Sequence, residues 1–259
     1  MSETKVVTAA LIVIGNEILS GRTRDANLQF LGDALNALGV RMTEARVIPD
    51  IEDLIIDCVN TYRESHDYVF TTGGIGPTHD DITSAAVAKA FGLALERNPV
   101  ADALLRDHYK PEDITPARMK MADIPIGAAL LDNPVSKAPG FRLENVYVLP
   151  GVPRIMQAMF KLFCHELVGG VPMLSCSITS RVPEGRVGVA LGEIQARYPD
   201  ADIGSYPFIK DGRAGTCLVV RHTDADVLDA AAGEIAELIR GHGGEPLIEA
   251  GKGNSASET

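Results

Sequence analysis

The sequence predicts an α/β domain with a mostly parallel sheet wrapped by helices, followed by a small α+β domain. Two observations support the first domain: short apolar runs alternate with amphipathic helical patterns, and the connections between them are short. A third observation separates the second domain. A glycine-rich linker at 169–172 is followed there by a different order of elements, β-α-β-β-α.

The first half of the larger domain has the clearest pattern. Lys5–Ile14 is a near-continuous apolar run, which is typical of a strand buried on both faces. After a turn-rich loop at Gly15–Arg24, leucines recur at helical spacing over Ala26–Leu38 and stop at Gly39. The elements that follow are expected at Val40–Ile48 (strand), Asp50–Arg63 (helix), Asp67–Thr72 (strand) and Ser84–Phe91 (helix).

The second half of this domain is less regular. Residues 97–122 have a helical pattern that prolines interrupt, so we expect a broken helix there. We place the bounds of the whole domain at residues 1–168. Its last elements are expected to be strands at Ala128–Leu131, Phe141–Leu143 and Val146–Leu149, and a helix at Val152–Leu167.

The smaller domain is expected at residues 174–247 as a small α+β sandwich of about 70 residues. The Gly/Ser-rich residues 250–259 are expected to be a disordered tail. The elements of the domain are expected at Leu174–Arg181 (strand), Val187–Arg197 (helix), Asp202–Tyr206 and Gly215–Arg221 (strands), and Ala225–Arg240 (helix).

Composition disfavours several classes of function. The chain has 259 residues and a formal net charge of −11, which disfavours non-specific binding of nucleic acids or anionic membranes. The four cysteines lie far apart without a Cys-x-x-Cys or Cys/His cluster, so we expect buried thiols and no zinc site. No apolar run reaches the roughly 18 residues of a membrane span, and no signal peptide is recognisable, so we expect a cytoplasmic protein.

The most informative stretch is the loop Thr71–Thr83, which joins a predicted strand to a predicted helix. Its glycines let backbone N–H groups approach a ligand, and a helix N-terminus favours negative charge there. Asp80 and Asp81 would repel a bare phosphate, but they fit if a divalent cation lies between protein and phosphate. The stretch therefore indicates a metal-assisted nucleotide or phosphoester site.

Acidic residues from three loops are expected at the same edge of the sheet. In open parallel sheets, ligands bind beyond the carboxyl ends of the strands, where these loops begin. The convergence of the loops is a stronger indication than any one motif. The carboxylates that they bring to this edge are Glu17, Asp25, Asp50, Asp80 and Asp81.

Simpler roles stay open for several of these residues. Asp50 would also be explained as the N-cap of its helix, and Asp81 or Thr83 as the cap of the helix after the glycine loop. Glu17 would also be explained as a solvated loop residue. Arg154 lies in the first turn of a helix, where a cation is unfavourable unless a ligand phosphate relieves it.

Four segments resemble the molybdopterin-binding (MoaB/Mog-like) domain. The resemblance is closer still to its version in competence/damage-inducible protein A (CinA) and at the N-terminus of eukaryotic FAD synthases. The smaller domain resembles the KH-like domain of the same proteins, so the resemblance covers residues 5–245. The four segments are Gly15–Gly21 with Asp25 and Asn27, Thr72–Thr83, Asn133–Pro134 with Ala138–Phe141, and Pro150–Arg154.

The resemblance implies a three-layer α/β fold with a nucleotide or pterin pocket at the strand ends. In Mog-type adenylyltransferases, the positions that match Asp50 and Asp81 serve metal binding and catalysis. The CinA type is associated with metal-dependent cleavage of pyrophosphate bonds in ADP-ribose-like nucleotides, and the related FAD synthase domain with FAD hydrolysis. We expect such a hydrolase; adenylyl transfer to molybdopterin and binding without turnover are the alternatives.

The chain also departs from the family pattern at two points. CinA proteins usually continue into a nicotinamide-nucleotide amidase domain, and that activity is not expected here. The family's common Gly-Thr after Asn-Pro-Val is Ser136-Lys137, and the added lysine would either pair with a phosphate or change the choice of substrate.

The expected site combines all of these loops. We expect catalysis by Asp50 and Asp81, with Mg²⁺ or another divalent cation and K⁺ as a further candidate. The expected partners are a nucleotide or pterin ligand and a second copy in a homodimer, since related domains self-associate. Metal ligands are expected at Glu17, Asp25, Asp80 and Asp81, and substrate contacts at Gly15, Asn16, Ser20, Asn27, Gly73, Gly74, Gly76, Pro77, Thr78, Pro150, Gly151 and Arg154.

Overall fold

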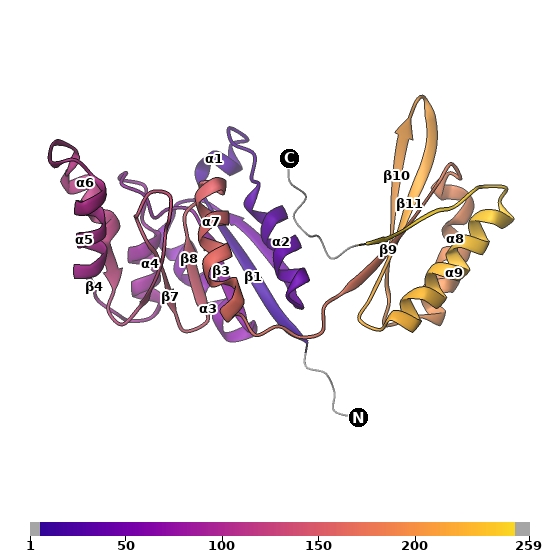
Figure 1. Ribbon diagram of the computed structural model, residues 1–259, viewed down its shortest axis with the longest axis horizontal. Helices are drawn as coiled ribbons and strands as arrows, with labels where there is room; N and C mark the ends of the chain where they lie inside the picture. The colour runs from indigo at the N-terminus through magenta and orange to yellow at the C-terminus, as the bar shows by residue number, and fades with distance from the viewer. Residues whose placement is uncertain (1–5, 252–259) are drawn as a thin grey trace. The chain divides into compact units, whose positions relative to one another are not determined.

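The computed structural model describes residues 6–251 of the chain. These residues form two compact units, which divide between Gly170 and Val171 within the predicted linker. Figure 1 shows the elements of both units, which are described here one at a time. No helix among residues 6–251 is long and apolar enough to cross a membrane.

The first unit is built on a six-stranded sheet in the order β2-β1-β3-β8-β7-β6. The four strands from β2 to β8 are parallel, and β7 and β6 add an antiparallel edge. The predicted α/β class with a mostly parallel sheet is therefore confirmed. The strands are β2 (Val40–Ile48), β1 (Val7–Ile14), β3 (Tyr68–Thr72), β8 (Val146–Leu149), β7 (Gly140–Leu143) and β6 (Ala129–Leu131).

Helices cover both faces of this sheet, because alternate residues of β1 point to opposite sides (Figure 1). Ala10, Ile12 and Ile14 pack with α3 (Glu52–Ser65) and α4 (Thr83–Ala90). The intervening residues of the same strand pack with α2 (Asn27–Ala37) and α7 (Pro153–Phe163). The result is three layers, as the resemblance implied.

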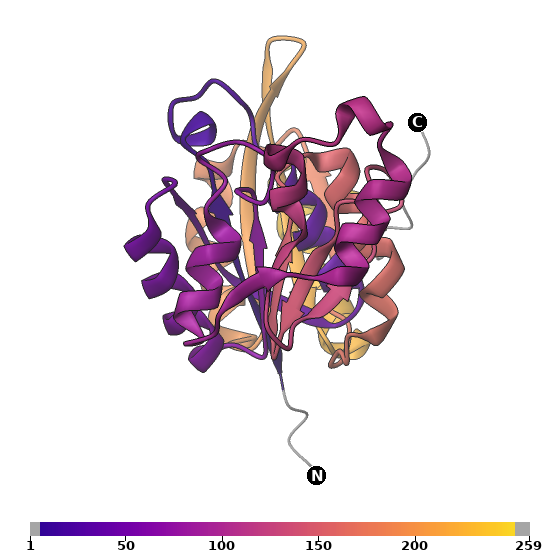
Figure 2. The ribbon, with the colours of Figure 1, turned by 90° about the vertical axis from the view of Figure 1, so that its left-hand side faces the viewer.

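The predicted broken helix at 97–122 is an inserted segment between two short strands, β4 (Leu95–Arg97) and β5 (Asp123–Pro125). These strands pair with each other and not with the main sheet, and the sequence pattern did not predict them. Figure 2 views the first unit from the side on which this segment lies. Its helices are α5 (Pro99–His108), η1 (Pro111–Asp113), α6 (Pro116–Met119) and η2 (Lys120–Ala122), and the first three each begin with a proline.

The second unit is an antiparallel sheet in the order β10-β11-β9-β12 with two helices. The strand β10 continues past Tyr206, where it was predicted to end, to Lys210. Pro207 has no backbone N–H, and it is tolerated because β10 is an edge strand with a neighbour on one side only. The fourth strand, β12, was not predicted, and it includes Ala250 and Gly251 of the expected disordered tail. The rest of that tail lies outside the described residues. The elements are β9 (Leu174–Ser180), α8 (Glu184–Arg197), β10 (Asp202–Lys210), β11 (Arg213–His222), α9 (Ala225–Gly241) and β12 (Leu247–Gly251).

Candidate functional site

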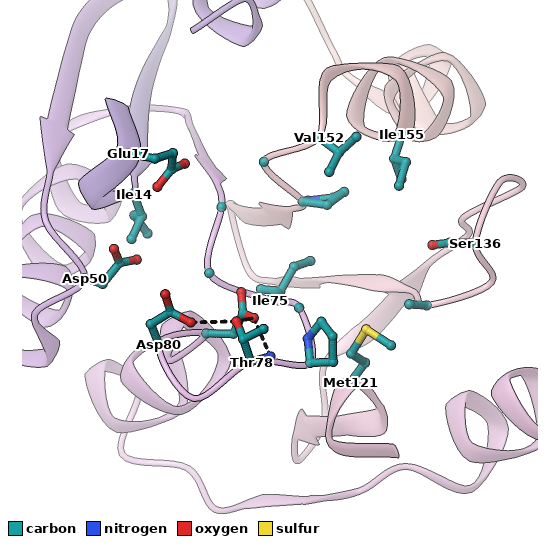
Figure 3. A pocket seen from close by; sticks show the side chains of 18 of the residues that line it. Ile14, Glu17, Asp50, Ile75, Thr78, Asp80, Met121, Ser136, Val152 and Ile155 are labelled. Carbon is teal, nitrogen blue, oxygen red and sulfur yellow. Dashed lines mark hydrogen bonds between the residues drawn. The ribbon is translucent and has the colours of Figure 1, made fainter. Parts of the chain in front are cut away.

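A cavity of about 470 Å³ opens at the carboxyl ends of β1, β2, β3 and β8, where an open parallel sheet is expected to bind ligands. Figure 3 shows Glu17, Asp50 and Asp80 on one side, together with Ile14, and Met121, Val152 and Ile155 on the other. The predicted site residues that line it are Glu17, Asp50, Gly73, Gly74, Gly76, Pro77, Thr78, Asp80, Asp81, Pro150 and Gly151.

The glycine loop after β3 is held by close backbone contacts. Gly73 and Gly74 have φ values of 107° and 70°, which side-chain-bearing residues rarely adopt. A Cβ on Gly73 would lie 2.1 Å from the carbonyl oxygen of Ile14, and one on Gly74 would lie 2.1 Å from Oγ1 of Thr83. These glycines therefore let the loop pass between β1 and α4, in addition to exposing backbone to a ligand.

Three consecutive backbone N–H groups at the start of this loop have no partner in the part of the chain that the structure describes. The N–H of Gly73 donates to the carbonyl oxygen of Leu149 (3.0 Å), which anchors the loop to β8. The next three N–H groups, of Gly74, Ile75 and Gly76, make no hydrogen bond among residues 6–251. All three residues line the cavity, so these donors are available to an anionic ligand.

Asp80 and Asp81 are tied to one hydroxyl group. Oγ1 of Thr78 lies 2.6 Å from Oδ1 of Asp80 and 2.5 Å from Oδ2 of Asp81. The backbone N–H of Thr78 also donates to Oδ2 of Asp81 (2.8 Å). A hydroxyl carries a single proton and cannot donate fully to both carboxylates, so negative charge is concentrated here. The hydrogen bond from Thr78 lowers the pKa of Asp80 from its ordinary value.

Asp50 links the loops that follow β1 and β2. Its Oδ2 accepts a hydrogen bond from the backbone N–H of Asn16 (2.9 Å), at the start of the one-turn helix α1 (Asn16–Leu19). Among residues 6–251, no N–H group of α3 donates to the carboxylate of Asp50, so the capping explanation does not hold. In Figure 3 its carboxylate lies between those of Glu17 and Asp80.

Several predicted site residues do not line the cavity and have structural roles. The carboxylate of Asp25 accepts from the N–H groups of Asn27 (3.3 Å) and Leu28 (2.9 Å) at the start of α2, so it is an N-terminal cap and not a member of the acidic group. Asn27 is 2% exposed and donates through Nδ2 to the carbonyl oxygen of Gly151 (2.9 Å), which positions the loop after β8. The others outside the lining are Gly15, Asn16, Ser20 and Arg154.

The apolar side of the cavity was not predicted. It is formed by Met121 from the inserted segment and by Val152 and Ile155 at the start of α7 (Figure 3). The turn Asn133–Ala138 also lines it through Ser136, and the buried Asn133 side chain closes that turn with four hydrogen bonds. Val152 lies in the Pro150–Arg154 segment of the family resemblance, whereas Met121 and Ile155 belong to none of the segments that carry it.

Lys137, which replaces a common threonine of the resemblance, is exposed at the tip of this turn with a φ of 60°. It does not line the cavity, whereas its neighbour Ser136 does. No lysine or arginine among residues 6–251 lines the cavity, although four carboxylates do.

The predicted metal ligands do not form a closed cage. No group of three or more His, Cys, Asp or Glu side chains among residues 6–251 is arranged to hold a metal ion. The donor set nevertheless fits Mg²⁺, which proteins usually bind through one or two carboxylates while phosphate and water oxygens complete its shell. Asp80 and Asp81, which share one hydroxyl, are such a pair.

Two family models match the chain, one for each unit. Residues 10–170 match "Probable molybdopterin binding domain", and residues 172–244 match "FAD synthase, middle domain". The C-terminal unit therefore corresponds to the middle domain of FAD synthases, and not to an amidase.

The chain covers very different shares of its relatives' lengths. A protein of Pyrobaculum calidifontis is 35% identical over 90% of this chain and 96% of its own length. The "Probable FAD synthase" of Caenorhabditis briggsae is 32% identical over 91% of this chain, which spans half of that protein. The crystal structure of the protein CinA from Thermoplasma acidophilum is 37% identical, with a TM-score of 0.58 over 61% of this chain and 96% of that one. The chain thus belongs to the molybdopterin-binding (MoaB/Mog-like) domain family, and within it to the CinA-like members.

Proposed function

We propose that this protein binds a nucleotide and hydrolyses its pyrophosphate bond with a divalent cation, on substrates such as ADP-ribose or FAD. The observation that carries the proposal is the charge of the cavity. Four carboxylates line it, and no lysine or arginine among residues 6–251 does so. Because an anionic ligand would be repelled by such a lining, its binding requires a cation that the ligand and the carboxylates share.

Other features of the cavity support a nucleotide as the ligand. The unpaired N–H groups of Gly74, Ile75 and Gly76 are donors for phosphate oxygens. The side lined by Met121, Val152 and Ile155 offers apolar contact area for a planar ring. A cavity of about 470 Å³ with one polar and one apolar side suits a ligand of that chemistry.

Each residue of the acidic side is assigned a role. Asp80 and Asp81 would hold Mg²⁺ or another divalent cation, which polarises phosphoryl oxygens and lowers the pKa of an attached water when it is bound. Asp50 accepts the proton of the attacking water through the oxygen that Asn16 does not occupy. Glu17 lies on the same side, where its carboxylate orients water.

The test is a panel of substrates with the purified protein. ADP-ribose, FAD and other nucleotide diphosphates are each supplied with Mg²⁺, Mn²⁺, Co²⁺ or Ni²⁺, with and without K⁺, and AMP release is measured. We expect AMP release that depends on the divalent cation. Adenylylation of molybdopterin from ATP would contradict the proposal and indicate a transferase. Ligand binding with no AMP release under any condition would contradict it and indicate a binding module.

The variant Asp81→Asn separates the site from the fold. It removes one charge of the cation-binding pair and replaces one of the two acceptor oxygens by an NH₂ donor, but it keeps the shape of the side chain. We therefore expect about a hundredfold loss of AMP release with unchanged circular dichroism. The matched control is Asp33→Asn, which removes an exposed carboxylate on α2 outside the cavity lining. Equal turnover of the two variants would contradict the assignment of Asp81.

A further inference from the structure

Lys120 contacts the acidic loop from the inserted segment. Its Nζ donates to the carbonyl oxygens of Thr78 (3.0 Å) and Asp81 (2.7 Å), which are 42 and 39 residues away in the sequence. Lys120 is partly buried and begins η2, the short helix that leads into β5. Its ammonium group therefore joins the two ends of the turn that presents Asp80 and Asp81.

The turn has little other support within itself. The N–H of Asp81 donates to the carbonyl oxygen of Thr78 across a longer 3.3 Å. The remaining bonds of the turn end on the carboxylates of Asp80 and Asp81, through the Thr78 hydroxyl and N–H. Those carboxylates are the groups that a ligand or cation would engage. Among residues 6–251, the turn is therefore held independently of those groups by the long Asp81–Thr78 backbone bond and by the two shorter carbonyl bonds to Lys120.

The charge of Lys120 also acts on the site without entering it. Lys120 does not line the cavity, yet its ammonium lies at the back of the turn that carries two carboxylates. An ammonium at this place offsets part of the repulsion between Asp80 and Asp81.

We propose that Lys120 is a positioning residue of the hydrolytic site: it holds the Thr78–Asp81 turn in the form that presents both carboxylates to the cation. The effect of Lys120 on catalysis rests on the proposed function. Its effect on the order of the Thr78–Asp81 turn does not, because that order can be measured without turnover. The next residue, Met121, lines the apolar side of the cavity. The inserted segment thus connects the ring-binding side of the cavity with the carboxylate side.

Three variants test the proposal in the full-length chain. Lys120→Met keeps the apolar stem but removes all donors, Lys120→Gln keeps a neutral donor, and Lys120→Arg keeps the charge. The matched control is Lys89→Met, because Nζ of Lys89 also bonds two oxygens, Oε1 and Oε2 of Glu52 (2.7 and 2.6 Å), outside the cavity.

The first measurement is hydrogen–deuterium exchange of peptides that cover residues 74–83, without substrate or divalent cation. We expect exchange at least tenfold faster in Lys120→Met than in the wild type, an intermediate rate in Lys120→Gln, and the wild-type rate in Lys120→Arg and Lys89→Met. Peptides from β8 serve as the check that the variants are folded. Wild-type exchange of residues 74–83 in both Lys120→Met and Lys120→Gln would overturn the proposal.

The second measurement is the dependence of AMP release on the Mg²⁺ concentration. We expect the half-saturating Mg²⁺ concentration to rise about tenfold to a hundredfold in Lys120→Met, the range seen when partners of metal ligands are removed. In Lys120→Arg we expect a half-saturating concentration close to that of the wild type. Faster exchange with an unchanged Mg²⁺ dependence would overturn the catalytic consequence. A wild-type protein that releases no AMP would refute the proposed function, while the exchange experiment would still decide whether Lys120 orders the turn.

Discussion

The link between the glycine loop and α4 depends on one buried hydroxyl, that of Thr83. Its Oγ1 donates to the carbonyl oxygen of Gly73 (3.0 Å), and its N–H donates to that of Gly74 (2.9 Å). Thr83→Val keeps the shape and the N–H but removes the hydroxyl donor. A buried carbonyl deprived of its donor costs about 1–3 kcal/mol, so we expect a loss of about 2 kcal/mol in the free energy of unfolding of the first unit.

The assay has to report on the first unit alone, because a chain of two units need not unfold in one step. Urea unfolding is followed by hydrogen exchange of peptides from β3 and β8. With a urea dependence of about 2 kcal/mol per molar, the midpoint falls by about 1 M in Thr83→Val. The control is Thr61→Val, which makes the same change at an exposed position of α3. Equal midpoints for both variants would refute the reasoning.

Three further predictions concern other parts of the chain. Gly74→Ala would place its Cβ 2.1 Å from Oγ1 of Thr83 at a φ of 70°, so we expect a lower urea midpoint and loss of nucleotide binding by calorimetry. Asn98→Ala removes the side-chain acceptor for two N–H groups at the start of α5, and we expect about 1 kcal/mol of destabilisation and faster amide exchange in that helix. Burial raises the pKa of the Cys58 thiol, which favours the unreactive protonated form. At pH 8 we therefore expect mass spectrometry to find iodoacetamide on the partly exposed Cys164 long before Cys58.

Much of the fold followed from sequence periodicity. The strand at β1 was recognisable because both of its faces are buried, which requires a continuous apolar run. The short strands β4, β5 and β12 were missed, whereas the equally short β6 and β7 were expected, so periodicity alone does not decide runs of three to five residues. Pairing partners far along the chain, such as β9 for β12, are what make such segments strands.

The candidate site was predictable to a different degree on its two sides. Asp50 and Asp81 were found because acidic residues after strand ends meet at one edge of a parallel sheet. Asp25 was assigned to the same group on this rule, but its carboxylate caps α2, a local use that competes with ligand binding. Most of the apolar side and the contact of Lys120 were not predictable, since Met121, Ile155 and Lys120 belong to no motif.

By itself, the sequence determined the order of elements, the glycine loop and the presence of carboxylates at the strand ends. These are local properties, because periodicity, turn residues and residue type act over a few neighbouring positions. The tertiary structure alone decided which carboxylates share the cavity, that Asp80 and Asp81 share the Thr78 hydroxyl, and that Lys120 supports their turn. Those contacts join segments that packing brings together, and no pattern within either segment specifies the position of the other.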